Sequence, residues 1–533
     1  MIRRFTGQRN RVIGQMGYPA GAVEVAPARS ARLRRGMFWK GNFDQLFIGG
    51  EWVEPLASER IDVVSPFTEQ VIATVPSASN ADMDRAVAAA RTAFDEGSWS
   101  RTTLAERTAI IARWRDLMVA DRDLLAEVIT DEMGCPITQS RTAQAANPAG
   151  VLDTYLEIAD EYPFRSLRRS VRGSALVTRE PVGVVAAVIP WNVPHAIAVQ
   201  KVAPALIAGC TVVLKPSPEA PLDAYLLAEM LAKAGVPAGV VNVAPADREA
   251  SEHLVTHPGV DKVAFTGSTA AGRRIASLCG HDLRRVTLEL GGKSAAVILD
   301  DADLDAAVEA LRHGSLRNNG QVCSLKTRIV VSRHRESELL DRLVGLVESM
   351  PVGDPRDAST QIGPLVSARQ RRMVENYIEI GRQEGGRTLI GGGRPPGLDH
   401  GWFVEPTIFT DVEPGMRIAQ EEIFGPVLSV LTYEDEDQAV AIANNSSYGL
   451  NGAIFTSDIE HGMELARRIR TGTVELNGNP AGPRAPMGGV KCSGIGRANG
   501  PEGLDNYVEH KSVGLPAGTV DALEQSWAEE KLA

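Results

Sequence analysis

The sequence is poor in cysteine, in aromatic residues and in long apolar runs. Only five of its 533 residues are cysteine, and none forms a CxxC pair or a cluster with histidine, so neither a disulfide framework nor a zinc site is indicated. Its apolar runs are far shorter than the roughly 20 residues that cross a bilayer. A net charge of −11 argues against general binding to nucleic acid. We therefore expect a reducing, cytoplasmic setting, with no membrane, nucleic acid or metal among the partners.

The first 36 residues differ from the rest of the chain. They contain eight arginines, no lysine and a single acid, Glu24, and they show neither periodicity nor the apolar core of a signal peptide. Three interpretations stay open: a mitochondrial targeting segment, a disordered basic arm, or a translation start at Met37. We expect 1–36 to be a dispensable tail, because a β-hairpin with a Gly-Gly turn is predicted soon afterwards, from Leu46 to Val53.

Helices and strands alternate through the middle of the chain. A helix is predicted from Ala81 to Phe94, with Asn80 as its N-cap. The apolar run from Val182 to Ile189 lacks alternation, as is typical of a strand buried on both faces of a parallel sheet. Further helices are predicted at 103–133, 199–208, 222–234 and 248–256, and further strands at 211–214, 239–243 and 262–265. This alternation predicts an α/β fold with a doubly wound parallel sheet.

Several short motifs carry side chains that are able to do chemistry. Cys323 lies at a predicted loop-to-strand junction, where a thiol with a lowered pKa can act as a nucleophile. Glu289 lies between two leucines, and apolar surroundings raise the pKa of a carboxyl group. Asn192 lies in an Ile-Pro-Trp-Asn-Val-Pro segment, and Lys215 ends a predicted buried strand. Taken singly, Cys323 fits a structural cysteine better than a nucleophile, Lys215 fits a solvated lysine equally well, and Glu289 has the alternative of an acid at a strand end.

In their order and spacing, the motifs resemble those of the NAD(P)-dependent aldehyde dehydrogenase superfamily, from about Gln45 to Val513. The resemblance implies a doubly wound parallel-sheet cofactor domain, an α/β catalytic domain and a β-stranded oligomerisation arm, in a homodimer or homotetramer. It divides the chain into a basic tail (1–36), an NAD(P)-binding domain (37–162 and 182–292), an arm (163–181 and 504–516), a catalytic domain with a late active-site loop (293–503) and an acidic tail (517–533).

The resemblance also implies a reaction, the oxidation of an aldehyde to a carboxylic acid by NAD(P). Cys323 would add to the aldehyde, and Asn192 with the backbone N–H of Cys323 would stabilise the oxyanion of the resulting thiohemiacetal. Loss of hydride to the cofactor would leave a thioester, which water activated by Glu289 would hydrolyse. Lys201 matches a family lysine that takes part in proton relay.

Binding residues are implied in the same way. The implied cofactor residues are Ile189, Pro190, Trp191, Lys215, Gly267, Ser268, Gly272, Leu290, Glu422 and Phe424. The implied substrate residues are Val193, Gln200, Arg317, Val322 and Ser324. NAD is the expected cofactor. NADP is the alternative, because Pro218 stands where many relatives carry an acid that would repel a 2′-phosphate.

Three other functions stay open. Arg317 coincides with an arginine by which semialdehyde dehydrogenases hold a substrate carboxylate, although Gln200 stands where a second arginine is usual. An arginine paired to a structural carboxylate is the competing interpretation. A CoA-acylating enzyme would not need Glu289, and a non-catalytic structural or binding protein on the same fold would not need Cys323. The late loop also departs from the family, since Met487 and Ala498 replace the usual Phe and Glu.

Overall fold

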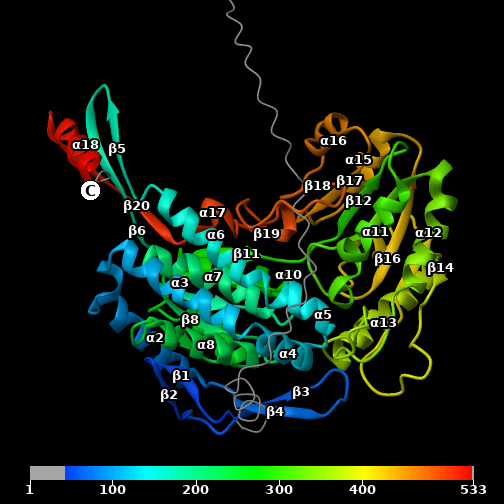
Figure 1. Cartoon of the computed structure of the whole chain (residues 1–533), viewed down its shortest axis with the longest axis horizontal. Helices are drawn as coiled ribbons and strands as arrows, with labels where there is room; N and C mark the ends of the chain where they lie inside the picture. The colour runs from blue at the N-terminus through cyan, green and yellow to red at the C-terminus, as the bar shows by residue number, and fades with distance from the viewer. Residues whose placement is uncertain (1–42, 531–533) are drawn as a thin grey trace, which may run out of the picture. The chain divides into compact units, whose positions relative to one another are not determined.

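The computed structural model describes residues 43–530, which contain two large β-sheets with their helices and a small arm sheet (Figure 1). These residues belong to one compact unit. The expected basic tail at 1–36 lies outside the described residues, so its role stays a prediction. A separate two-stranded ribbon is formed by β3 (Arg60–Val64) and β4 (Val71–Pro76).

The first sheet has eight strands in the order β19-β11-β10-β7-β8-β9-β1-β2. The strands are β1 (Leu46–Ile48), β2 (Glu51–Val53), β7 (Val184–Val188), β8 (Thr211–Lys215), β9 (Val241–Val243), β10 (Lys262–Thr266), β11 (Arg285–Glu289) and β19 (Gly494–Ile495). The five from β11 to β9 run parallel, and the outer strands are antiparallel. Strand β7 is buried along its whole length, as its unbroken apolar run predicts.

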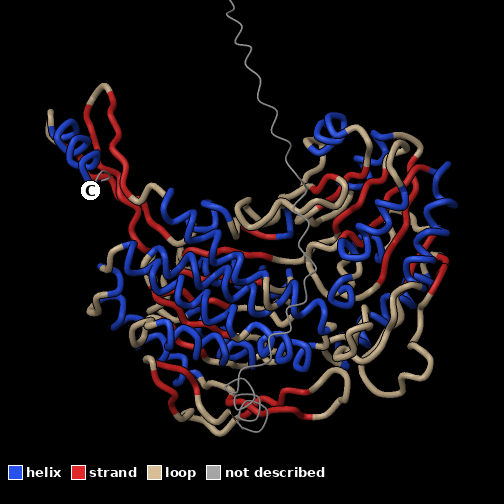
Figure 2. Tube along the Cα trace, in the orientation of Figure 1, coloured by secondary structure: helices blue, strands red, loops and turns tan. Residues whose placement is uncertain are grey.

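Helices cover both faces of this sheet, as a doubly wound fold requires (Figure 2). One face packs against α2 (Asn80–Asp95), α9 (Arg248–Thr256) and α10 (Thr269–His281). The other side carries α3 (Leu104–Ala120), α4 (Arg122–Met133), α5 (Ile137–Gln139), α6 (Asn147–Glu161), α7 (Pro194–Ala208) and α8 (Leu222–Ala234). The helices predicted at 222–234 and 248–256 have the expected bounds.

Two helix starts differ from the prediction. The N-cap of α2 is Ser79 rather than Asn80, because Ser79 and Asp82 form a reciprocal capping box in which each side chain accepts the other's backbone N–H. Helix α7 begins at Pro194 rather than at residue 199. Proline is favoured in the first turn, where its missing N–H costs no hydrogen bond.

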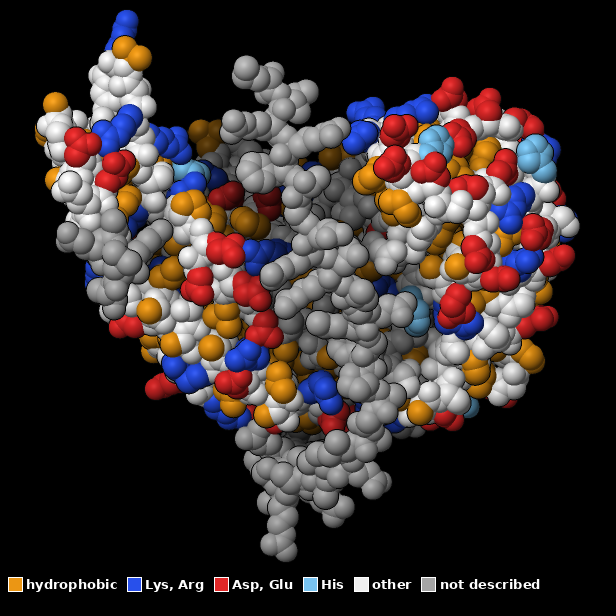
Figure 3. Space-filling view, turned by 45° about the horizontal axis from the view of Figure 1, so that its top comes forward, with side chains coloured by type: hydrophobic (Ala, Val, Ile, Leu, Met, Phe, Trp, Pro, Cys, Tyr) orange, Lys and Arg blue, Asp and Glu red, His pale blue; other side chains and the backbone are white. Residues whose placement is uncertain are grey.

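The second sheet has seven strands in the order β14-β15-β16-β13-β12-β17-β18, parallel except for β14. The strands are β12 (Ser294–Ile298), β13 (Lys326–Ser332), β14 (Arg387–Ile390), β15 (Thr407–Thr410), β16 (Val427–Tyr433), β17 (Gly452–Phe455) and β18 (Glu475–Leu476). Its helices are α11 (Leu304–Ser315) and α12 (Glu336–Glu348) on one face, and α13 (Ala368–Gln383), α14 (Arg417–Gln420), α15 (Glu436–Asn444) and α16 (Ile459–Ala466) on the other. On the face that Figure 3 shows, acidic and basic side chains are interspersed over this part of the surface.

The arm is an antiparallel sheet of β5 (Arg165–Ser170), β6 (Gly173–Pro181) and β20 (Val508–Leu515) in the order β20-β6-β5, and it extends away from the two large sheets (Figure 2). The expected strand at the end of the chain begins later than residue 504, because α17 (Gly500–Asp505) occupies its first part. The acidic tail contains a helix, α18 (Thr519–Glu530). Arg169 of the arm forms ion pairs with the carboxylates of Asp521 and Glu524 on this helix, each at 2.7 Å.

Candidate active site

A left-handed turn positions the loop that carries Cys323. Asn318, Asn319 and Gly320 have φ angles of 52°, 60° and 76°, a region that only glycine and asparagine enter at low cost. The Asn319 side chain holds the turn by donating to the carbonyl oxygens of Gly134 (3.0 Å) and Pro364 (2.8 Å). The Asn-Asn-Gly sequence is thus a structural requirement of the loop.

Asn192 is tied directly to the same loop. It is buried, and its side-chain amide donates to the carbonyl oxygen of Gln321, 2.9 Å away and two residues before Cys323. Its own carbonyl oxygen accepts from Gln144 (3.0 Å) and Asn318 (2.9 Å). The second amide hydrogen of Asn192 has no acceptor among the described residues, so it is free to bind an oxyanion.

Glu289 ends strand β11 with an unusual lack of partners. Both of its carboxylate oxygens are buried, and neither has a hydrogen-bond partner among the described residues. Burial raises the pKa of Glu289 to about 8, and the positive charges of Lys201 and Arg497 oppose this rise. Burial also lowers the pKa of Lys201 to about 8, while the charge of Glu289 opposes that change. The site therefore holds a carboxyl and an amine that both exchange protons near neutral pH.

The thiol of Cys323 has a raised pKa rather than the lowered one that a nucleophile requires. Burial is the main cause and the carboxylates of Glu422 and Glu289 add to it, bringing the pKa to about 12. Arg317 and the backbone N–H of Cys323 itself act in the opposite direction. The site therefore has to supply a base or a further positive charge before Cys323 can react as a thiolate.

Three of the expected cofactor residues meet beside this loop. The backbone N–H of Gly292 donates to a Glu422 carboxylate oxygen at 2.8 Å, and a Cβ on Gly291 would collide with the same carboxylate. The rings of Trp191 and Phe424 pack edge to face, with centroids 5.4 Å apart. Trp191, Glu422 and Phe424 thus come from distant segments to one place.

The other expected cofactor residues lie at the carboxyl edge of the first sheet, where parallel sheets bind ligands. Ile189 and Pro190 follow β7, and the N–H of Ile189 donates to the carbonyl oxygen of Lys215 at 3.1 Å. Burial lowers the pKa of Lys215 to about 8. Ser268 caps α10 by accepting the N–H of Ala271 (3.3 Å). Gly267 lies in the same turn, and Gly272 packs so closely on Leu290 that a Cβ would collide with that side chain.

Of the expected substrate residues, Val322 and Ser324 flank Cys323 in the chain, and Arg317 acts on its charge. Four of them are half-buried, namely Val193, Gln200, Val322 and Ser324. The Arg317 side chain is exposed yet lies close enough to Cys323 and Glu475 to feel their charges. Glu475 pairs instead with Lys326 (2.5 Å) and Asn451 (2.8 Å). Among the described residues, Arg317 has no ion pair.

Sequence reasoning missed the residues that hold the candidate catalytic residues in place. Gln144 and Gln139 belong to an irregular helical segment, and they bond to the backbone of Asn192 (3.0 Å) and Asn318 (2.7 Å). No motif marks such glutamines, because their partners lie more than 40 residues away. The two asparagines of the turn carry the one available signal, since an Asn-Asn-Gly sequence favours a left-handed backbone.

The comparison with known proteins decides the family, since the model of the "Aldehyde dehydrogenase family" matches residues 52–513. The chain belongs to the aldehyde dehydrogenase family. A geranial dehydrogenase from Castellaniella defragrans is 48% identical over 471 residues, which cover 88% of this chain and 98% of the relative. A 3-succinoylsemialdehyde-pyridine dehydrogenase from Pseudomonas sp. is 41% identical, covering 89% of this chain and 98% of the relative.

Solved structures of aldehyde dehydrogenases share the fold. The Mycobacterium tuberculosis aldehyde dehydrogenase complexed with NAD+ is 46% identical, with a TM-score of 0.88 and coverage of 90% of this chain and 99% of that one. A cysteine-to-alanine mutant of aldehyde dehydrogenase C from Pseudomonas syringae, with NAD+ and octanal, is 40% identical, with a TM-score of 0.86 and coverage of 88% and 96%.

These comparisons confirm the predicted fold class, the enzyme class and a nicotinamide cofactor. The chain is an aldehyde dehydrogenase, an oxidoreductase. In the described residues, no helix is long and apolar enough to span a membrane. Nor do residues 43–530 contain a cluster of three or more His, Cys, Asp or Glu residues that could hold a metal ion.

Proposed function

We propose that Cys323, Asn192 and Glu289 oxidise an aldehyde to its carboxylic acid, with NAD as the cofactor. The observation that carries this proposal is the Glu289 carboxyl group, which is buried without a hydrogen-bond partner in residues 43–530 and has a pKa of about 8. A structural acid at a strand end would accept hydrogen bonds from its neighbours. An unpartnered carboxylate near the thiol is suited to accept a proton from water.

Each catalytic residue has one task. The thiol of Cys323 loses its proton to solvent, and its sulfur forms a bond to the aldehyde carbon; the oxyanion accepts hydrogen bonds from the Asn192 amide and the backbone N–H of Cys323. The aldehyde carbon would lose its hydride to NAD+, which would supply the hydride acceptor when bound. Glu289 then takes a proton from the water that attacks the thioester carbon, and the sulfur of Cys323 leaves as a thiolate. Lys201 can receive this proton, because its amine titrates in the same range.

The cofactor would be held at the edge of the first sheet. Lys215 would bond to the adenosine ribose, the turn at Gly267 and Ser268 would face phosphate, and Glu422 would hold the nicotinamide ribose. NAD is favoured over NADP, because the Glu219 carboxylate is close enough to act on the pKa of Lys215. We accordingly assign 37–162 and 182–292 to the cofactor domain and 293–503 to the catalytic domain.

The test is NADH formation by the purified protein with a panel of aldehydes, with NAD+ or NADP+, and with or without CoA. We expect steady turnover with NAD+ alone, a carboxylic acid as product, and no turnover by Cys323→Ala. A product that forms only with CoA would favour the CoA-acylating alternative. Absence of turnover with every aldehyde would favour a non-catalytic protein.

A second candidate, oxidation of a semialdehyde, rests on Arg317. Arg317 is an exposed residue that lies close enough to Cys323 to feel its charge, and the nearby carboxylate of Glu475 is already paired with Lys326. A substrate carboxylate could therefore bind Arg317. In this case Arg317→Met raises the KM for succinate semialdehyde at least tenfold but leaves the KM for octanal unchanged. Equal effects on both substrates would leave a broad aldehyde dehydrogenase as the better description.

We also propose a cytoplasmic homodimer or homotetramer assembled through the arm of 163–181 and 504–516. Most residues of β20 are exposed. Among the described residues, β20 is an outer strand that pairs on one side only, with β6, and such edges pair readily with another chain.

A further inference from the structure

Lys293 is a buried lysine to which the catalytic scheme assigns no task. It lies between Gly292 and strand β12, and only 2% of its surface is exposed. Its ammonium nitrogen is buried and makes no hydrogen bond within residues 43–530. Because an isolated charge in a protein interior is strongly unfavourable, this ammonium needs a nearby negative charge.

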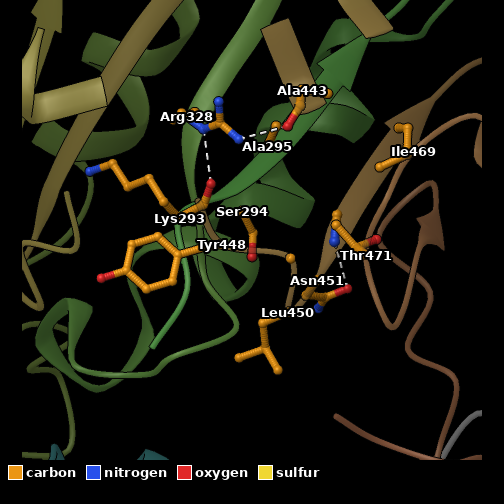
Figure 4. A pocket seen from close by; sticks show the side chains of 12 residues that line it. Lys293, Ser294, Ala295, Arg328, Ala443, Tyr448, Leu450, Asn451, Ile469 and Thr471 are labelled. Carbon is orange, nitrogen blue, oxygen red and sulfur yellow. Dashed lines mark hydrogen bonds between the residues drawn. The ribbon is translucent and has the colours of Figure 1, made fainter. Parts of the chain in front are cut away.

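Arg328, a positive group that also acts on Lys293, donates hydrogen bonds to backbone oxygens. It donates to the carbonyl oxygens of Lys293 (2.8 Å), Ile442 (2.8 Å) and Ala443 (2.9 Å). Figure 4 shows that the Lys293 side chain runs away from Arg328 and from the small cavity beside it, alongside Tyr448. Lys293 thus points toward another part of the structure.

Two carboxylates act on Lys293, Glu422 first and Glu421 second. Glu421 already accepts a hydrogen bond from the hydroxyl of Tyr377 (2.7 Å). The backbone N–H of Gly292, the residue before Lys293, donates to a carboxylate oxygen of Glu422 at 2.8 Å. The other titratable groups that face this pair are Arg328, Glu421, Cys323 and Tyr448.

We propose that Lys293 is a positioning residue for the cofactor, whose buried ammonium keeps Glu422 ionised so that this carboxylate can accept hydrogen bonds from the nicotinamide ribose. The inference rests on the proposed role of Glu422. Burial raises the pKa of Glu422 to about 7, and the Gly292 N–H and the Lys293 charge oppose this rise. Burial and Arg328 lower the pKa of Lys293 to about 7, and the charges of Glu422 and Glu421 oppose this fall.

The test is the dissociation constant for NAD+, measured by calorimetry from pH 6 to pH 9, without substrate. For the natural protein we expect binding to strengthen as pH rises through about 7, because Glu422 becomes ionised. In Lys293→Met the pKa of Glu422 is higher, so this rise moves to higher pH. Each unit of pKa makes binding at pH 6 about tenfold weaker, and the two proteins bind equally at pH 9. The matched control is Ser294→Ala, which removes the next buried, unpartnered hydroxyl and should keep the natural profile.

Three results separate the inference from the function it rests on. If Glu422→Gln neither weakens binding nor removes the pH dependence, the proposed role of Glu422 fails. If Glu422→Gln does both but Lys293→Met keeps the natural profile, the inference alone fails. It also fails if Lys293→Met weakens binding equally at every pH, because that pattern indicates loss of structure. Should Lys293→Met not fold, Lys293→Arg should keep the natural profile and Lys293→Gln should show the displaced one.

Discussion

Glu289 owes its chemistry to what surrounds it rather than to its residue type. Both oxygens are buried without a hydrogen bond from the described residues, and burial raises the pKa to about 8. Lys201 moderates that rise, and its own amine titrates in the same range. Because each residue's charge acts on the pKa of the other, the two residues titrate as a pair.

Hydrolysis of the acyl-enzyme should depend on pH through this pair. Glu289 accepts a proton only as a carboxylate, so the deacylation rate should rise as pH increases through about 8. Stopped-flow measurement of deacylation from pH 6 to pH 10 checks this. In Glu289→Gln, whatever deacylation rate remains should not rise with pH. A rise of the same size in that variant would mean that the pH dependence comes from another group.

Asn192 should matter for the rate rather than for binding. Loss of one oxyanion donor typically lowers kcat about 10²- to 10³-fold, so we expect this loss for Asn192→Ala, with little change in the KM for NAD+. Gln144→Leu removes only a donor to the Asn192 backbone, at 3.0 Å, and should cost less. Equal losses in the two variants would indicate that Asn192 has a purely structural role.

The motifs around Cys323, Glu289 and Asn192 were readable because short segments carry them. The pKa of the Cys323 thiol could not be predicted from the sequence, because it depends on Glu289 and on Glu422, which lies about a hundred residues later in the chain. The hydrogen bond from Asn192 to Gln321 could not be predicted either, because it joins a segment after the first sheet's β7 to a segment before the second sheet's β13. Sequence patterns report local preference, whereas these properties come from contacts between distant parts of the chain.

At the scale of elements, the Gly291-Gly292 segment between β11 and β12 joins the proposed general base, Glu289, to the loop that carries Cys323. A Cβ on Gly292 would collide with the carbonyl oxygen of Cys323. We expect Gly292→Ala to fold but to lose at least 100-fold in kcat, because the loop must move. Gly314→Ala is the matched control, since it meets open space in α11 and should stabilise the protein by about 0.5–1 kcal/mol. Similar kcat values in these variants, measured beside thermal unfolding, would contradict this view of the segment.

The elements that were predicted well are those with clear boundaries in the sequence. Helices α8 and α9 have the expected bounds; Gly235 ends α8 in the left-handed region, and Asp247 caps α9. The N-cap of α2 was predicted one residue late, because Ser79 and Asn80 are both good caps and the reciprocal bond with Asp82 decides between them. The start of β20 was missed, because α17 ends within the same mixed sequence.

At the scale of the whole molecule, the arm should determine assembly. A chain that ends at Tyr507 lacks β20 and α18, so it loses the outer strand of the arm. We expect this chain to be monomeric in analytical ultracentrifugation, where the full chain is a dimer or a tetramer. A chain that ends at Leu515 keeps β20 and serves as the control, with unchanged assembly. The same oligomer in all three would place the interface elsewhere.

The most direct test of the account is a pre-steady-state measurement of NADH formation by the natural protein, Cys323→Ala and Glu289→Gln, with one aldehyde that the natural protein turns over. The account predicts steady turnover for the natural protein, and neither burst nor turnover for Cys323→Ala. It predicts for Glu289→Gln a burst of about one NADH per active site followed by little turnover. A burst in Cys323→Ala, or full steady turnover in Glu289→Gln, would contradict it, because acylation of Cys323 and hydrolysis through Glu289 could then not be the two steps of the reaction.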